Sequence, residues 1–313
     1  RGGGRRPGGR RNMTVVERNS AAIPNATEYL VRRLSDREQI RRILEGRRPY
    51  AAYALGQLEP MLFRQTDWWL SSSAANQGLM LHSRGGLGNA TFAMGEAGAL
   101  DALLTVHPGP HHTFLTCEPH HLETMLRHFE LEQRQTMIRM HATAATFQPI
   151  DGPVRRLTGA DVRAINRLYR TDGVPSFYSA RQIDDAVYFG VERDGELIAV
   201  AGTHVISQAS AIAVVGNVYT HPRYRGQRFA QCTTGAVTEQ LLRFCRDIVL
   251  SVDPTNTPAV RAYERLGYTE AARLIEGAAT RRDATGTASL VRRTLARIRG
   301  RGRGGEVVRL HAE

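Results

Sequence analysis

A turn that contains three arginines and one glycine lies between an apolar run and a long helical segment. Residues 211–220 predict a strand, and residues 229–246 have the spacing of a long helix. The turn between them reads His221-Pro-Arg-Tyr-Arg-Gly-Gln-Arg228. Because the first amides of a helix have no partners within it and arginines add positive potential, this order predicts a site for a pyrophosphate. An exposed basic turn is the alternative interpretation.

A second segment follows a predicted strand at 247–252 and reads Asn256-Thr-Pro-Ala-Val-Arg-Ala-Tyr-Glu-Arg-Leu-Gly-Tyr268. Residues 258–266 predict a helix that ends at Gly267, and a last strand is expected near 268–274. Tyr263 lies on this helix, where a core aromatic is one interpretation and a proton donor is the other.

Together, the two segments resemble the GNAT superfamily of acetyltransferases. Residues 219–230 are similar to its coenzyme A loop, a pattern of Arg or Gln, two residues, Gly, one residue, then Gly or Ala. Arg225 fills the first place and Ala230 the last, whereas Arg228 stands where the family usually has glycine. A Cβ at this position would crowd the approach to a pyrophosphate, although its guanidinium could pair with a phosphate. Residues 256–268 match the family's second segment.

The resemblance implies a fold and a cofactor. The fold class is α/β (α+β): a mixed, mostly antiparallel sheet with splayed central strands, flanked by helices. Acetyl-CoA is the expected co-substrate, held by backbone groups beside the splayed strands, by amides of the turn and by an asparagine on the pantetheine chain. The implied binding residues are Val218, Tyr219, Thr220, Arg225, Gly226, Gln227, Arg228, Phe229, Ala230, Gln231 and Asn256.

The implied reaction is direct attack of a neutral amine on the thioester. Tyr263 occupies the position of the family's usual acid, which protonates the leaving thiolate. Many relatives carry a glutamate as base at the position of Ser251, which is a poor base alone. Asn217, Glu192, His204 or a water relay are the alternatives, and the sequence does not choose among them.

An internal repeat predicts two similar domains. Val31-Arg-Arg-Leu34 followed by Ser35 is matched by Val154-Arg-Arg-Leu157 followed by Thr158, each a short strand before a capped helix. We expect a disordered Arg/Gly-rich start at 1–27, a GNAT-like domain without cofactor at 28–145, the catalytic GNAT domain at 151–278 and a basic tail at 279–313.

Charge and cysteine content limit the remaining classes. The net charge of +12 over 313 residues comes mostly from 1–12 and 281–313, which carry +5 and +6, so a folded basic face is not indicated. Contact of these tails with nucleic acid is a minor alternative. Three cysteines without metal-ligand spacing predict neither a metal site nor a disulfide framework. Without a run of eighteen apolar residues, a cytoplasmic protein without membrane contact is expected.

Two functions fit these observations best. The first is transfer of acetyl from acetyl-CoA to a primary amine of a small molecule or peptide. The second is an acyl-CoA sensor or scaffold without turnover, which the departure at Arg228 and the missing glutamate favour. The acceptor, the acyl length and the oligomeric state are left open.

Overall fold

The computed structural model describes residues 26–85, 88–173 and 177–311. The strands are β1 (Ala26–Leu34), β2 (Thr66–Ser72), β3 (Gln77–Ser83), β4 (Ala90–Gly95), β5 (His112–Cys117), β6 (Phe129–Ala142), β7 (Val154–Arg156), β8 (Phe189–Arg193), β9 (Glu196–Ser207), β10 (Ile212–Thr220), β11 (Asp247–Val252), β12 (Thr269–Arg281) and β13 (Glu306–His311). The α-helices are α1 (Arg37–Glu45), α2 (Ala52–Gly56), α3 (Pro60–Phe63), α4 (Ala97–Val106), α5 (Leu122–His128), α6 (Val162–Tyr169), α7 (Ala180–Asp184), α8 (Phe229–Leu242), α9 (Thr257–Glu264) and α10 (Thr287–Arg299). Of the expected disordered start at 1–27, residues 1–25 lie outside the described chain and the last two belong to β1.

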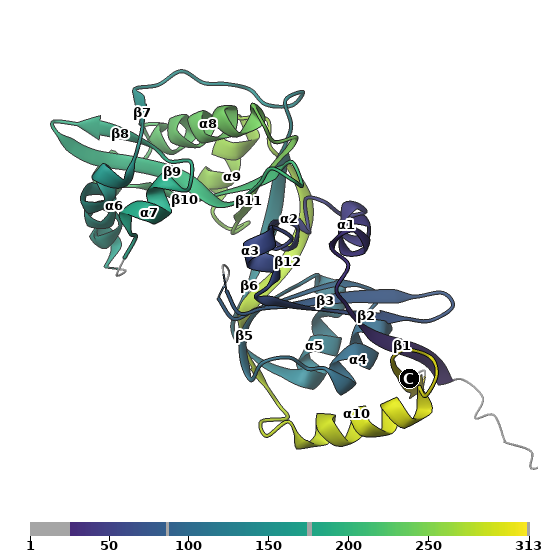
Figure 1. Ribbon diagram of the computed structural model, residues 1–313. Helices are drawn as coiled ribbons and strands as arrows, with labels where there is room; N and C mark the ends of the chain where they lie inside the picture. The colour runs from purple at the N-terminus through teal and green to yellow at the C-terminus, as the bar shows by residue number, and fades with distance from the viewer. Residues whose placement is uncertain (1–25, 86–87, 174–176, 312–313) are drawn as a thin grey trace, which may run out of the picture.

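All these strands form one open sheet, with helices on both of its faces (Figure 1). Their order is β13-β1-β2-β3-β4-β5-β12-β6-β11-β10-β9-β8-β7. The pairs β4–β5 and β10–β11 are parallel and the other pairs are antiparallel. The expected mixed, mostly antiparallel sheet flanked by helices is therefore confirmed.

The chain passes twice through the same succession of elements. A strand and two or three short helices lead to three antiparallel strands, a helix, a strand, a helix and a final strand, first from β1 to β6 and then from β7 to β12. In each half, the fourth strand pairs in parallel with the fifth: β4 with β5, and β10 with β11. The repeat that begins at Val31 and Val154 thus lies in equivalent first strands, β1 and β7.

The two halves exchange their final strands. β12, the last strand of the C-terminal half, lies between β5 and β6 of the N-terminal half. β6, the last strand of the N-terminal half, lies between β11 and β12. Because both strands are interior, each half supplies hydrogen bonds that the sheet of the other half needs.

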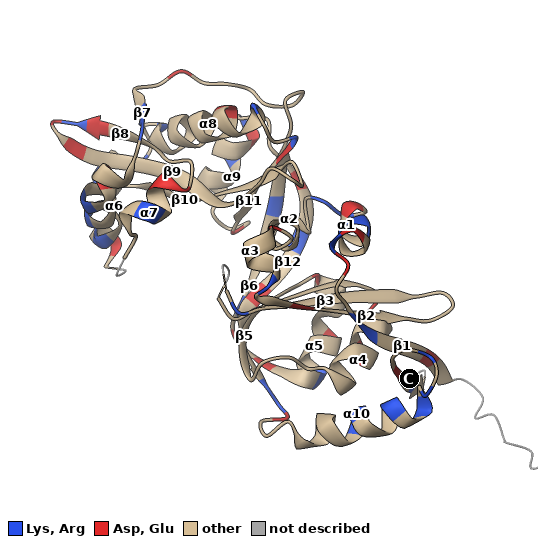
Figure 2. Ribbon diagram, in the orientation of Figure 1, with Lys and Arg blue, Asp and Glu red and all other residues tan. Residues whose placement is uncertain are grey.

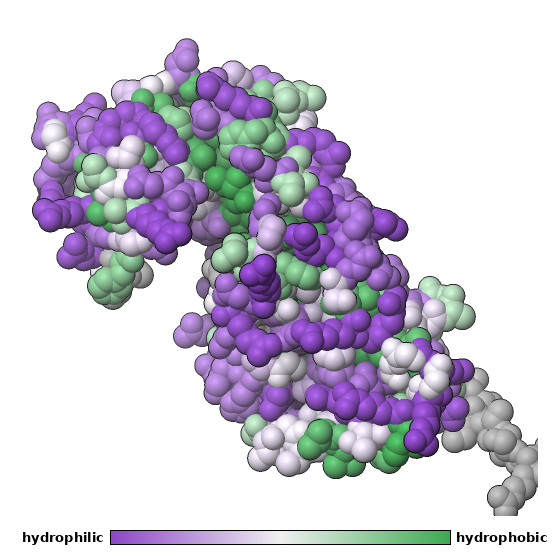
Figure 3. All heavy atoms as spheres, in the orientation of Figure 1, coloured by the Kyte–Doolittle hydropathy of each residue, from purple (hydrophilic) through white to green (hydrophobic). Residues whose placement is uncertain are grey.

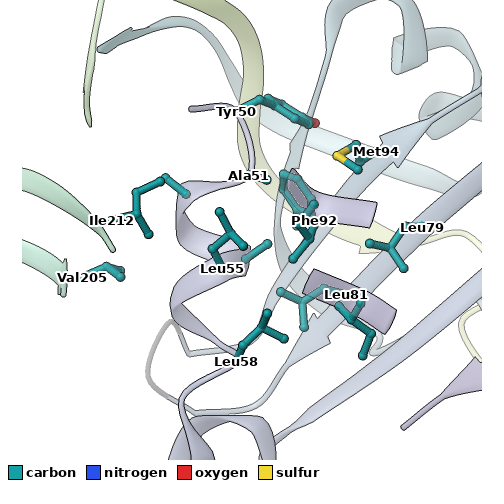
Figure 4. Packing of buried hydrophobic residues seen from close by; sticks show 14 of the residues in the cluster. Tyr50, Ala51, Leu55, Leu58, Leu79, Leu81, Phe92, Met94, Val205 and Ile212 are labelled. Carbon is teal, nitrogen blue, oxygen red and sulfur yellow. The ribbon is translucent and has the colours of Figure 1, made fainter. Parts of the chain in front are cut away.

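The largest core cluster contains residues of both halves. Leu55 of α2 is fully buried and belongs to one cluster with Leu81 of β3, Val205 of β9, and Ile212 and Val214 of β10. Figure 4 shows Leu55 between the side chains of the N-terminal strands and those of β9 and β10. The halves therefore share a hydrophobic core as well as a sheet.

A group of ion pairs joins the same halves at the start of β11. Asp247 accepts hydrogen bonds from Arg48 Nε at 2.8 Å, His141 Nε2 at 2.9 Å and Arg246 Nε at 3.1 Å. Burial opposes ionisation of Asp247, but the hydrogen bonds from these three side chains outweigh it and hold the pKa of the carboxyl well below its usual value. Arg48 follows α1, so this contact ties the N-terminal half to the C-terminal one.

The C-terminal segment corrects an expectation from the sequence. Residues 279–313 were predicted to be a basic tail, but they contain α10 and β13, and β13 pairs with β1. Ala296, Val307 and Val308 are buried, and Glu306 binds His107 and Arg297. Within α10 only Ser289 and Ala296 are buried, whereas larger apolar residues such as Leu290 and Ile298 are exposed, so composition did not predict the helix's place in the fold. Figure 2 marks basic positions along the ribbon of α10 and shows acidic and basic positions spread along the rest of the chain.

The two predicted helix caps have different outcomes. Thr158 and Asp161 form the expected capping box. For α1, Ser35 is the wrong residue: Asp36 caps the helix and accepts from the amides of Glu38 at 2.9 Å and Gln39 at 3.3 Å. Both residue types cap helices well, so the sequence alone does not decide between neighbours.

Leu55→Ala tests whether the halves fold together. We expect the free energy of unfolding to fall by about 2 to 5 kcal/mol, because the change leaves a cavity in the shared core. Denaturant unfolding should remain a single transition, shifted as a whole. Met61→Ala, at a position that is 71% exposed, is the control and should have almost no effect. Two separate transitions, of which only one moves, would show that the halves fold independently.

Asp247→Asn tests the ion pairs at the start of β11. At neutral pH we expect the variant to lose about 2 to 3 kcal/mol, because Arg48 keeps its charge in a largely buried position. Folding lowers the pKa of Asp247, so its stabilising contribution is present above the ordinary aspartate pKa of about 4 and declines as the pH falls below it. The melting temperatures of variant and wild type should therefore approach each other between about pH 4 and pH 2. A difference that does not change with pH would contradict this assignment.

Candidate active site

β10 and β11 pair along only part of their length. Their parallel register ends at Val215 and Leu250, whereas β10 continues to Thr220 and β11 to Val252. The backbone of 216–220 therefore has no strand partner on the side of β11. The predicted divergence of these strands is confirmed, and we call the opening between them the strand gap.

A bulge in β10 shapes one wall of the strand gap. The pairing register with β9 shifts here, and Asn217 has a φ of +54°, in the left-handed region that asparagine tolerates better than most residues. Tyr169 donates a hydrogen bond to the Asn217 carbonyl, and Tyr178 donates one to Asn217 Oδ1 at 2.8 Å. Asn217 Nδ2 donates to the Tyr188 hydroxyl at 2.7 Å. These contacts hold the bulge in one conformation.

The turn before α8 presents a row of free amides. A 3₁₀ turn, Pro222–Tyr224, leads into Gly226, whose φ of +79° favours glycine. The first hydrogen bond of the helix is donated by the Cys232 amide to the Arg228 carbonyl at 3.0 Å. None of the six amides from Gly226 to Gln231 donates a hydrogen bond to a described residue. The predicted anion-binding arrangement of strand, turn and helix is therefore present in the fold.

The arginines of the turn differ in their contacts. Arg225 Nε donates to the Thr220 carbonyl at 3.2 Å and Nη2 contacts the Asp172 carboxylate at 3.2 Å, so this side chain braces the turn. Arg228 has a φ of +63° and precedes α8 as its cap residue. Its guanidinium makes no ion pair or hydrogen bond with a described residue. It is thus free to contact an anion, at the expense of a backbone conformation that suits glycine better.

The end of β10 has an unsatisfied polar atom. Thr220 Oγ1 is buried and has no hydrogen-bond partner among the described residues. The preceding Tyr219 points to the other face, where its hydroxyl meets Thr171 Oγ1 at 2.7 Å, so only its backbone can face the strand gap. Val218 packs against the cluster that contains Tyr263. A polar chain entering the strand gap, such as pantetheine, fits the free backbone and the Thr220 hydroxyl.

Asn256 and Tyr263 lie on the far side of the strand gap, at the two ends of α9. Asn256 Oδ1 caps the helix by accepting from the Ala259 amide at 3.3 Å, and its side-chain NH2 makes no hydrogen bond with a described residue. Tyr263 is 7% exposed, and burial raises its pKa to about 12. Its hydroxyl makes no hydrogen bond with a described residue. The Tyr263 hydroxyl therefore stays protonated over the physiological range of pH.

The candidate bases separate into two groups. Ser251 accepts a hydrogen bond from Arg139. Glu192 of β8 pairs with Arg155 of the edge strand β7, and this hydrogen bond lowers the pKa of Glu192. Neither arrangement suits a base. His204, by contrast, reaches the bulge, with Nε2 at 2.9 Å from Asn217 Oδ1.

Sequence reasoning missed several residues of this site. Tyr53 of α2 contacts His204 across 151 residues of sequence, and Arg139 of β6 reaches Ser251 across 112. No local pattern connects such distant positions. Tyr178 and Tyr188 could have been found from the sequence. Aromatic residues make up 7% of the chain, so two tyrosines close to a predicted hairpin indicate an aromatic site.

The equivalent position in the N-terminal half has a different geometry. Only Glu96 separates β4 from α4, and the Gly95 carbonyl accepts a hydrogen bond from His121 at 2.6 Å. There is no counterpart of the eight-residue basic turn between β10 and α8. This difference supports the prediction that the N-terminal half does not bind a cofactor.

Comparison with known proteins agrees with this geometry. Residues 160–268 match the model of the acetyltransferase (GNAT) family. The match covers 109 of the 313 residues, all of them in the C-terminal half. No significant match was found among curated proteins.

Three solved structures share the GNAT fold and extend over both halves. A GCN5-related N-acetyltransferase from Kribbella flavida has a TM-score of 0.53 at 15% identity and covers 74% of this chain and 95% of its own. One from Sphaerobacter thermophilus has 0.52 at 17% identity, covering 81% and 95%. A Drosophila protein has 0.55 at 13% identity, covering 79% and 98%. At such identities the similarity is one of fold, and fold and family together support acyl transfer in general.

One group of possible metal ligands has another explanation. Glu118, His120 and His121 lie close enough together to approach a cation. However, both ring nitrogens of His121 are engaged, with the Glu118 amide at 3.2 Å and the Gly95 carbonyl at 2.6 Å, and Arg47 pairs with the Glu118 carboxylate. Hydrogen bonding therefore accounts for this group. None of the described helices is long and apolar enough to cross a membrane.

Two substitutions at one position test the backbone of the turn. Arg228→Gly and Arg228→Ala remove the same charge, but only glycine adopts a φ of +63° without strain. We expect Arg228→Gly to be more stable than Arg228→Ala by about 1 kcal/mol in denaturant unfolding. Equal stability of the two variants would mean that residue 228 does not need the left-handed conformation.

Proposed function

We propose that the chain is an acyl-CoA-dependent N-acyltransferase that moves acetyl from acetyl-CoA to a primary amine of a small molecule or peptide. The observation that carries the proposal is the strand gap with its row of six unpaired amides at one end. A backbone opening of this kind is energetically unfavourable in the middle of a sheet unless a ligand uses it.

The residues around the strand gap divide the binding task. Amides from Gly226 to Gln231 and the Arg228 guanidinium suit the pyrophosphate. The free backbone of Val218 and Thr220, together with the Thr220 hydroxyl, suits the pantetheine amides, and the Asn256 side-chain NH2 can donate to the same chain. A cofactor bound in this way would have its thioester beside the bulge at Asn217.

The chemistry requires two proton transfers. The neutral amine attacks the thioester carbonyl, a C–N bond forms, and the C–S bond breaks. Backbone donors at the bulge would stabilise the oxyanion, and Tyr263 would give its proton to the thiolate. Because the pKa of Tyr263 is raised to about 12, the hydroxyl stays protonated until the thiolate needs it.

A second candidate function is a sensor or scaffold that binds acyl-CoA without turnover. Two observations favour it: Arg228 occupies a left-handed position that suits glycine, and Ser251 is bonded to Arg139 instead of acting as a base. The two functions differ in one respect, which is release of free thiol in the presence of an amine.

Tyr263→Phe tests the proposed function. We expect wild-type protein to bind acetyl-CoA with a micromolar dissociation constant, about −8 kcal/mol, and to release thiol with members of a primary-amine panel. The variant should bind equally well in calorimetry, while kcat falls by about 100-fold, the lower end of the range for a positioned proton donor.

The outcomes of this experiment separate the candidates. Binding without thiol release from wild-type protein would favour the sensor, and absence of binding would contradict both functions. Thiol release that the phenylalanine variant retains in full would leave the enzyme but remove Tyr263 as its acid.

A further inference from the structure

A chain of hydrogen bonds joins the N-terminal half to the bulge of β10. The Tyr53 hydroxyl lies 2.7 Å from His204 Nδ1, and His204 Nε2 lies 2.9 Å from Asn217 Oδ1. Tyr53 comes from α2 in the N-terminal half, whereas the other two residues lie on β9 and β10. The imidazole is therefore held between the two halves.

The partners of Asn217 determine where the protons lie. Its Nδ2 donates to Tyr188, so its Oδ1 is the acceptor facing His204. His204 must then carry its proton on Nε2, which leaves the lone pair of a neutral ring on Nδ1. Tyr53 is the group that donates to this lone pair. Its oxygen keeps an acceptor site for another proton.

The surroundings keep His204 neutral and Tyr53 protonated. Desolvation lowers the pKa of His204, and the Arg139 guanidinium adds to this effect, whereas the Asn217 contact and Glu276 oppose it. Burial raises the pKa of Tyr53 to about 12. The protonated Tyr53 hydroxyl therefore donates a hydrogen bond to the unprotonated Nδ1 of His204.

Arg139 shows that this pair lies at the strand gap. Its guanidinium bonds to Ser251 of β11 and lies 4.9 Å from the centre of the Tyr53 ring. Tyr53 packs on the shared core, whereas Tyr263 belongs to the cluster under α8 and α9 on the opposite face. The two tyrosines therefore approach the strand gap from opposite faces of the sheet. In Figure 3 the outline of the molecule is hollowed between the lobe with α6 and α7 and the central part that carries α3.

We propose that Tyr53 and His204 together take the proton from the attacking amine, an inference that rests on the proposed acyl transfer. As the C–N bond forms, an amine proton passes to the Tyr53 oxygen while the Tyr53 proton passes to His204 Nδ1. The resulting imidazolium donates from both nitrogens, to Tyr53 and to Asn217. His204 is exposed on one side, so the proton then leaves to water. Tyr263 gives a proton to the thiolate and regains one from water, so the enzyme returns to its starting protonation state and no net proton is gained or lost.

A double-mutant cycle with Tyr53→Phe and His204→Gln tests this pair. Each change keeps the size of the side chain and removes one member of the relay. We expect kcat with a productive amine to fall by about 100-fold in either variant and no further in the double variant, because the two groups act as a unit. Affinity for acetyl-CoA in calorimetry should stay within about twofold, since neither side chain lies on the cofactor's side of the sheet. His112→Gln, an exposed histidine of the N-terminal half, is the control and should retain wild-type kcat.

A second readout does not depend on turnover. Nitrogen-15 NMR of labelled histidines should show His204 as the Nε2-protonated tautomer near neutral pH, with an Nδ1 shift that changes in Tyr53→Phe. A wild-type protein without thiol release would contradict the proposed function, and the His204 tautomer would still report on the pair. Full activity of the single variants, additive losses in the double variant, or an Nδ1-protonated His204 would overturn the inference while leaving the proposed function in place.

Discussion

The end of hydrogen bonding between β10 and β11 after Val215 is the constraint on which the rest of the site depends. Two parallel strands that separate inside a sheet leave backbone groups with no partner, and such groups are costly unless something else satisfies them. Every feature of the site can be related to this opening. The bulge at Asn217 turns β10 away from β11. The turn at Gly226 directs the first amides of α8 toward the strand gap, and α9 lies on the far side of the gap. The tyrosines bonded to Asn217 keep the opening from collapsing.

Much of the C-terminal half could be predicted because its signals are local. Residues 247–252 were expected to be a strand and are β11, and the free amides before α8 follow from the order of strand, turn and helix. Tyr263 and Asn256 were assigned through the resemblance of residues 256–268 to the family's second segment, whose motif is short and contiguous in sequence. In such cases a few neighbouring residues determine the backbone, and tertiary packing only confirms it.

The remainder depends on contacts that no local pattern records. Neither β6 nor β12 carries a sign that it pairs with the other half, since an interior strand has the same apolar alternation in either sheet. The bond between Tyr53 and His204 joins positions 151 residues apart. The wrong prediction of a basic tail at 279–313 has a different cause. This segment contains many arginines and only a few buried apolar residues, so its average composition indicated a tail although α10 and β13 belong to the fold.

The exchange of β6 and β12 also bears on how such a protein can change over time. The N-terminal half has a one-residue connection between β4 and α4 at the position where the C-terminal half has its basic turn before α8. However, β6 is an interior strand of the sheet that holds the strand gap, so the N-terminal half cannot be shed without opening the other one. The two halves are therefore inherited as one unit. A change that removed either exchanged strand would leave the sheet of the other half with an unpaired edge.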